Sequence, residues 1–250
     1  MSRTIAVFGA GTGLGSAIAR RFAREGYRVA LVARRPAPLD DLVRELAAGG
    51  VEAYAFPADL TATADVPALL AAVEEKLGPI DVVEYAPITT APFTPAAELT
   101  PEALQRYLDL YVFTPMAIVR SVVPGMIARG DGAILVTHGA SAVEPMPGMS
   151  GVGPAMAAAR NYLASLHGEL ADHGVYVGTI NVNALVRGSA GHRAITSGEL
   201  PVALPPGVEL PSIAPEELAD AYWEMVAHRR RFEATIPALV GVTFSSAPAS

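Results

Sequence analysis

Strand-like and helical stretches alternate along the whole chain. Between the first two strand-like runs, Leu14, Ile18 and Phe22 recur every fourth residue, which predicts an amphipathic helix. Alternation of this kind is typical of repeated βαβ units, so the sequence predicts an α/β fold with a doubly wound parallel sheet and helices on both faces. The predicted strands are Thr4–Phe8, Arg28–Ala33, Val51–Phe56, Asp81–Tyr85, Ala133–Thr137 and Val175–Val182.

Longer helices are predicted in the second half of the chain. Thr100-Pro101 offers a capping hydroxyl and a proline at the first helical position, and the apolar pattern then runs to about 128. Further helices are predicted at 154–173 and 215–228. The stretch 183–214 is rich in Gly, Pro and Ser and too long for an ordinary connection, so we expect a substrate-covering lid there. No linker or repeat divides the chain, and 1–250 is predicted to be one domain.

Composition narrows the classes of function. The hydrophobic residues make up 51% of the chain, but they are spread along it, so we predict no membrane-spanning helix. A net charge of −7 offers no basic field for nucleic acid, which favours a small-molecule partner. The chain has no cysteine, and its early glycines would break a signal helix; we therefore expect a cytoplasmic protein. The histidines show no metal-binding spacing, so no metal site is predicted.

A glycine-rich turn follows the first predicted strand and opens the first predicted helix. Its backbone N–H groups and the helix dipole can hold a pyrophosphate. Tight turns also need glycine for steric reasons alone, so the turn by itself is weak evidence. The candidate residues are Gly9, Gly11, Thr12, Gly13, Leu14 and Gly15.

Two arginines stand where the second predicted strand ends. An NAD-specific site would place a carboxylate here to bind the ribose 2′-hydroxyl, but the sequence reads Ala33-Arg34-Arg35. Guanidinium groups suit a 2′-phosphate, because arginine pairs with phosphate through two hydrogen bonds. A solvated basic turn is the alternative. We interpret Arg34 and Arg35 as favouring NADP(H).

With these features in place, the chain resembles the short-chain dehydrogenases/reductases from Thr4 to about Arg231. The pattern Gly9-x-x-x-Gly13-x-Gly15 is similar to that family's turn, and Ala58-Asp59-Leu60-Thr61 is similar to its contact with the adenine ring. The resemblance implies a single Rossmann-type domain, NADP(H) binding that includes Asp59 and Leu60, and a homodimer or homotetramer formed through the helices at 101–128 and 154–173.

The family's catalytic residues are missing from their places. In the family, a tyrosine protonates the substrate oxygen, a lysine four residues later lowers its pKa, and a serine and an asparagine assist. The resemblance places these positions at Val152, Met156, Gly139 and Tyr111. No Tyr-x-x-x-Lys occurs anywhere in the chain, whose only lysine is Lys76. The usual tyrosine–lysine acid therefore cannot act here.

Other side chains are candidates for the chemistry. His138 ends the fifth predicted strand and could protonate an oxygen at neutral pH, with Ser141 in the same loop. Tyr85 and Tyr111 are expected to face the cleft, where either could donate a proton or stack on a substrate. The alternatives are a strand-end histidine bonded to backbone and aromatic rings that fill space.

Three functions remain open from the sequence. The leading hypothesis is an NADPH-dependent reductase whose substrate, such as an iminium, quinone, enone or polycyclic ketone, does not need the usual acid and takes a proton from water or His138. The second is a non-redox cyclase, isomerase or dehydratase on the same fold. The third is a non-catalytic NADP(H) sensor or partner subunit. Met146, Met149 and Met156 are expected around the cleft, where flexible thioethers suit bulky apolar ligands or simply fill the core.

Overall fold

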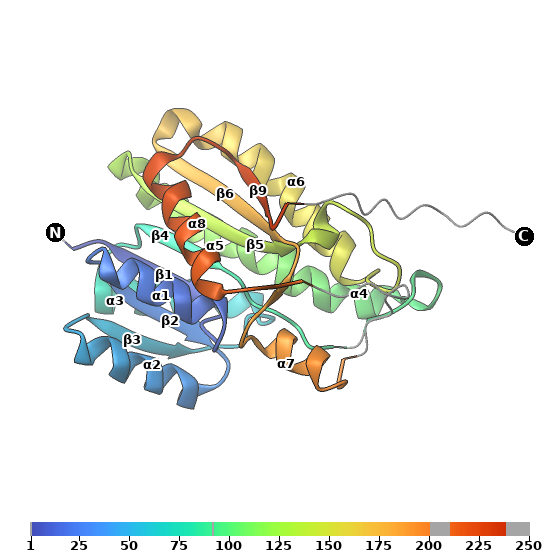
Figure 1. The fold of residues 1–250 in the computed structure, drawn as a ribbon. Helices are drawn as coiled ribbons and strands as arrows, with labels where there is room; N and C mark the ends of the chain where they lie inside the picture. Colours follow the sequence, from blue (N-terminus) through green and yellow to red (C-terminus); the bar gives the residue numbers. More distant parts are fainter. Residues whose placement is uncertain (1, 92, 201–210, 239–250) are drawn as a thin grey trace, which may run out of the picture.

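The fold is organised around a seven-stranded, fully parallel sheet (Figure 1). The computed structural model describes residues 2–91, 93–200 and 211–238. The strand order is β3-β2-β1-β4-β5-β6-β9. The strands are β1 (Thr4–Phe8), β2 (Arg28–Ala33), β3 (Ala53–Pro57), β4 (Val82–Tyr85), β5 (Gly132–Gly139), β6 (Val175–Val182) and β9 (Glu233–Ile236).

Helices cover both faces of the sheet, and each face has its own apolar core. One face carries α1 (Leu14–Arg24), α2 (Pro36–Ala48) and α8 (Pro215–His228). The other carries α3 (Val66–Leu77), α4 (Pro101–Leu108), α5 (Thr114–Arg129) and α6 (Val152–Leu170). Strands buried on both faces explain the near-continuous apolar runs in the sequence. The predicted doubly wound α/β fold is confirmed.

The strand order reverses between β1 and β4, and this opens a crevice at their carboxyl ends. The loops that follow the two strands pass very close to each other. A Cβ at Gly9 would lie 2.7 Å from Pro87 N and 2.8 Å from Ala86 O, and Gly9 has a φ of +89°. Only glycine fits this point.

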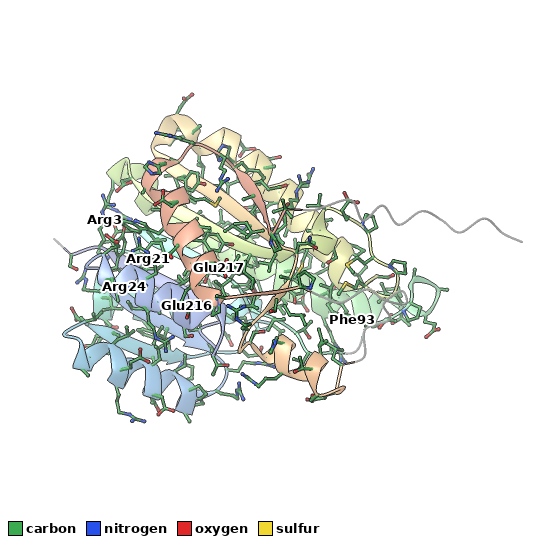
Figure 2. All side chains as sticks on the ribbon, in the orientation of Figure 1. Arg3, Arg21, Arg24, Phe93, Glu216 and Glu217 are labelled. Atoms are coloured by element: carbon green, nitrogen blue, oxygen red, sulfur yellow. The ribbon has the colours of Figure 1, made fainter. Side chains whose placement is uncertain are left out.

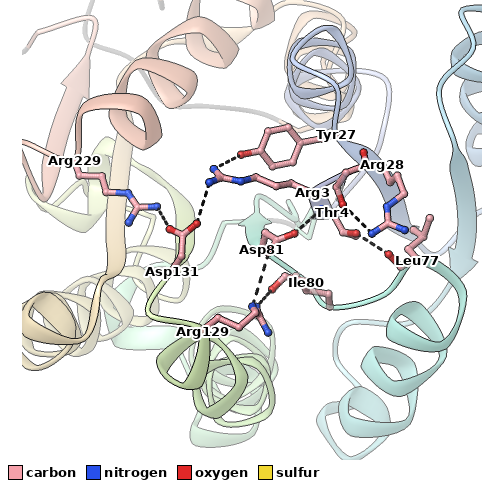
Figure 3. A network of polar contacts seen from close by, with 11 residues as sticks. Arg3, Thr4, Tyr27, Arg28, Leu77, Ile80, Asp81, Arg129, Asp131 and Arg229 are labelled. Atoms are coloured by element: carbon pink, nitrogen blue, oxygen red, sulfur yellow. Dashed lines mark hydrogen bonds and ion pairs between the residues drawn. The ribbon is translucent and has the colours of Figure 1, made fainter.

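Polar contacts tie together the opposite, amino-terminal edge of the sheet (Figure 3). Asp131 pairs with Arg3 at 3.1 Å and with Arg229 at 2.6 Å, and Asp81 accepts the backbone N–H of Thr4 at 2.7 Å. Figure 2 shows Arg3 at this end of the molecule and Phe93 at the other. Exposed pairs of this kind contribute little stability each, about 0–1 kcal/mol. They link the amino-terminal ends of β1 and β5 to the end of α8.

Two segments differ from the sequence-based prediction. β9 was not predicted, because its four residues follow a run of arginines and carry no long apolar pattern. The expected lid at 183–214 contains β7 (Leu185–Val186), α7 (Ala190–Thr196) and β8 (Ser212–Ile213), while 201–210 lies outside the described residues. The long helix begins at Pro101 as predicted and runs to Arg129, with a π-helical segment at Asp109–Phe113.

Within the described residues, the stretch Pro101–Arg129 is long and apolar enough to cross a membrane by length and composition. Half of its most apolar window is buried in the fold. Ile118, Val122 and Met126 belong to the core against the sheet. A core helix passes the same test, and the apolar character of this stretch has that explanation here.

One acidic side chain lies at the centre of the sheet. Glu84 on β4 is fully buried, and its Oε1 lies 3.1 Å from Thr137 Oγ1. Thr137 Oγ1 lies 2.7 Å from the hydroxyl of Tyr222, which in turn donates to Val136 O at 3.0 Å. A protonated Glu84 can donate into this chain of hydroxyls. Burial raises the pKa of Glu84 to about 8.

The raised pKa predicts that Glu84 makes stability depend on pH. In the unfolded chain the carboxyl ionises near pH 4.5, whereas the folded protein retains the proton until about pH 8. This group therefore lowers the free energy of unfolding as pH rises between those values, by at most about 1.4 kcal/mol per pH unit. Glu84→Gln should remove that slope, and chemical denaturation from pH 5 to pH 8 measures it.

Glu45→Gln is the control, because Glu45 is exposed and its hydrogen bonds with Arg20 lower its pKa. Its contribution to pH dependence lies below the tested window. Equal pH slopes in the wild type and in Glu84→Gln would show that Glu84 is not the buried neutral acid.

Candidate cofactor and substrate cleft

Two adjoining cavities follow the carboxyl edge of the sheet. The arginine cavity, of about 790 Å³, is lined by Arg34, Arg35, Asp59 and Leu60 among others. The histidine cavity, of about 330 Å³, includes His138 in its lining. Both share Gly9, Gly11, Arg35 and the loop at 86–89, so they form one cleft. Every residue that the sequence assigned to the cofactor lines this cleft.

The glycine-rich turn lies at the middle of the cleft and is open to an anion. Helix α1 begins at Leu14, and no side chain caps its amino end at Gly13. Its first turn holds no acidic residue. The free N–H groups and the dipole of an eleven-residue helix therefore face the cleft, which is the arrangement that holds a phosphate.

The arginine cavity combines two free cations with an ordered carboxylate. Arg34 and Arg35 are exposed, and neither forms an ion pair within the described part of the chain. Asp59 Oδ1 accepts the backbone N–H of Thr61 at 3.0 Å and its hydroxyl at 2.9 Å. These hydrogen bonds, with a smaller effect of Arg34, lower the pKa of Asp59. The cavity thus offers positive charge for a phosphate and a fixed acceptor.

The histidine cavity is largely apolar. Its walls come from the loop after β5, the start of α6, and the segment 182–200, in addition to the glycine-rich turn. The three predicted methionines all line it, and their flexible side chains can adapt to different apolar shapes. Its apolar side chains include Phe93, Met146, Met149, Val152, Met156, Leu185, Ile195 and Leu200.

The positions that the family resemblance assigned to catalysis gather around this same cavity. Val152, Met156, Gly139 and Tyr111 all line it. The Met156 sulfur lies 3.2 Å from the backbone N of Gly139, so a thioether fills the space between these two positions. None of Val152, Met156 and Gly139 carries a side-chain proton donor.

His138 has a defined tautomer. The hydroxyl of Thr179 donates its single proton to Val136 O at 2.8 Å, so its oxygen accepts from His138 Nδ1, 3.0 Å away. His138 Nε2 then carries a lone pair, and it has no hydrogen-bond partner among the described residues. Burial, with a smaller effect of Arg160, lowers the pKa of His138 to about 3. This low pKa argues against His138 as an acid at neutral pH, so its role as a proton donor stays a prediction.

Tyr111 brings a hydroxyl to the cavity from the π-helical segment. Its oxygen accepts the backbone N–H of Thr89 at 3.3 Å, which leaves its own proton free to donate. Single π-helical turns within α-helices often occur at functional sites. Burial raises the pKa of Tyr111 above its ordinary value, so the phenol stays protonated. Tyr111 can orient a substrate oxygen but is a weak acid.

Tyr85 and Ser141 differ in their placement. Tyr85 is 2% exposed and lines neither cavity, and its hydroxyl donates to Leu110 O. The expectation that Tyr85 faces the cleft is wrong, because the alternation of β4 directs this ring into the core beneath the long helix. Ser141 does line the histidine cavity.

Two further polar features could not be predicted from the sequence. Asn181 pairs in register with His138, is fully buried, and has no partner within the described chain for either amide atom. Arg193 of α7 reaches back to the glycine-rich turn and hydrogen bonds Thr12. Both depend on contacts between segments distant in sequence, which no local pattern reveals.

Comparisons with known proteins agree with this geometry. The sequence model of the short chain dehydrogenase family matches residues 3–190. A short chain dehydrogenase of Pseudocercospora fijiensis is 32% identical over 184 residues, covering 72% of this chain and 58% of that protein. Glycine betaine reductase of Emericella nidulans is 35% identical over 143 residues, covering 57% of this chain and 11% of that protein. The chain thus matches less than two thirds of the length of either relative.

Solved structures share the fold over nearly the whole chain. A short-chain dehydrogenase from Sphingobium yanoikuyae in complex with NADPH is 29% identical, with a TM-score of 0.79, and the match covers 95% of this chain and 89% of that one. A short chain oxidoreductase from Pseudomonas aeruginosa, described as containing an atypical catalytic center, is 24% identical, with a TM-score of 0.79 and 98% of both chains covered. By fold and by sequence, the chain belongs to the short-chain dehydrogenase family of oxidoreductases.

Proposed function

We propose that the protein transfers hydride between NADP(H) and a small-molecule substrate of bulky, apolar shape, without the family's usual tyrosine–lysine acid. One observation carries the proposal: a single cleft joins two free arginines, an uncapped glycine-rich turn and an apolar cavity. NADP(H) needs positive charge for its 2′-phosphate, an open helix amino end for its diphosphate, and room for the substrate beside its nicotinamide, in this order along a cleft. When bound, NADP(H) supplies or accepts the hydride at its nicotinamide ring.

Preference for NADP(H) over NAD(H) rests on the end of β2. Arg34 and Arg35 are exposed there, and no carboxylate replaces either of them. Arg35 lines both cavities, next to the turn. The structure of the Sphingobium relative with NADPH supports the same preference.

The substrate class follows from the histidine cavity. Its apolar walls favour a bulky apolar molecule, while Tyr111 offers a hydrogen-bond donor. Neither Tyr111 nor His138 is a competent acid at neutral pH, because burial disfavours both the imidazolium and the phenolate. Quinones, iminium ions, enones and activated polycyclic ketones can accept hydride and take any proton from water.

Binding measurements test the arginines. Arg35→Ala should weaken NADPH binding about 10- to 100-fold, because a charge-assisted bond to the 2′-phosphate is lost, and should leave NADH binding unchanged. Isothermal titration with each nucleotide measures both affinities. Arg44→Ala, an exposed arginine of α2 paired with Asp41, is the control. Equal binding of NADPH by Arg35→Ala and the wild type would refute the assignment.

A pair of bicyclic probes tests the missing acid. With NADPH, menadione should be reduced at least about 100-fold faster than 2-decalone, since an unactivated ketone depends on general-acid catalysis. The loss of NADPH absorbance reports both rates. His138→Gln, which retains an acceptor, should reduce menadione within about threefold of the wild-type rate. Comparable rates on both probes would mean that the cavity contains an effective acid.

We also propose that a second copy of the chain covers the long helix. Phe113 and Ile127 are large apolar side chains exposed on Pro101–Arg129, at 40% and 37%. The double substitution Phe113→Lys and Ile127→Lys should shift the protein toward monomer, because charge at a buried interface is costly. Sedimentation equilibrium measures the shift, with Ile88→Lys as the control on another exposed apolar residue. A monomeric wild type would contradict the proposal.

A further inference from the structure

Arg193 connects helix α7 to the glycine-rich turn. Its Nη1 donates to Thr12 Oγ1 at 3.0 Å and to Gly188 O at 2.5 Å. The hydroxyl of Thr12 also donates to Gly188 O, at 2.9 Å. The guanidinium group therefore lies beside the amino end of α1, where the backbone N–H groups are uncapped.

The charge of Arg193 has no counter-ion within the described residues. Both of these hydrogen-bond partners are neutral oxygens, and the side chain is exposed. By contrast, Arg20 and Arg160 each hydrogen bond a glutamate carboxylate. An arginine with neutral partners beside a helix amino terminus adds positive potential where the dipole is already positive.

The chain around Arg193 packs tightly on the turn. A Cβ at Gly13 would lie 2.8 Å from Ser189 Cβ, so the two segments are in van der Waals contact. Ser189 and Gly13 both line the histidine cavity, which runs between the turn and α7. Arg193 itself lines neither cavity, and its guanidinium group is held 3.0 Å from Thr12, beside the turn where an anion would bind.

We propose that Arg193 binds the diphosphate of the cofactor, at the phosphate on the nicotinamide side. This inference rests on the proposed NADP(H) function. Arg193 would exchange its bonds to Thr12 and Gly188 for bonds to phosphate oxygens, and charge-assisted bonds are roughly twice as strong as neutral ones. The positive charge for the cofactor then comes from two distant places, the end of β2 and α7.

The same helix forms part of the substrate wall. His192 and Ile195, on either side of Arg193 in the sequence, line the histidine cavity. A phosphate that holds Arg193 also fixes these neighbours, because they share one short helix. Arg193 is therefore a positioning residue for the substrate wall as well as a cofactor ligand.

Two nucleotides separate phosphate binding from a merely structural role. NADPH contains both phosphates of the diphosphate, whereas adenosine 2′,5′-bisphosphate lacks the one on the nicotinamide side. In isothermal titration, Arg193→Gln should weaken NADPH binding about 10- to 50-fold and change binding of the bisphosphate by less than about twofold. Arg193→Lys, which retains the charge, should recover part of the loss.

Arg187→Gln is the matched control, because Arg187 is an exposed arginine of the same segment. It should bind both nucleotides as the wild type does. The inference would be overturned if Arg193→Gln bound NADPH as the wild type does. It would also be overturned if the variant lost affinity for both nucleotides equally, because Arg193 would then only support the turn. A wild type that binds neither nucleotide would overturn the proposed function itself, so the two failures are distinguishable.

Discussion

The close approach of the loops after β1 and β4 is the constraint on which the cleft depends. The sheet grows in opposite directions from these two strands, so the helices that follow them cover opposite faces and leave a crevice between. The crevice is narrow at its base, because Gly9 touches the backbone of Ala86 and Pro87. The arginines, the turn and the apolar cavity are placed along the crevice by strands that end at one edge.

The polar groups in the histidine cavity are suited to orientation more than to proton transfer. His138 is held neutral by burial and in one tautomer by Thr179. Tyr111 is held as a phenol. A cavity with apolar walls and a fixed phenol can select a substrate by shape and hydrogen bonding, while the reactivity has to come from the substrate and the cofactor.

Local patterns in the sequence predicted the features that depend on short segments. The glycine-rich turn and the two arginines after β2 could be found because strand, turn and helix follow one another directly. Tyr85 could not be placed correctly, because its direction depends on the alternation within a strand of only four residues. The state of His138 depends on a threonine of the neighbouring strand, and the position of Arg193 depends on a contact across most of the chain. Such facts come from tertiary packing, which a single sequence does not display.

The contact between Gly13 and Ser189 means that the first turn and the segment after β6 share one steric boundary. Ser189, which lies far along the chain, leaves no room for a side chain at Gly13, in addition to any requirement of the turn itself. A larger residue at 13 would displace α7, and with it the wall that contains Ile195. The effects of substitutions at Gly13 and Ser189 should therefore be non-additive. A relative with a side chain in place of Gly13 would need a rearranged backbone at the position of Ser189.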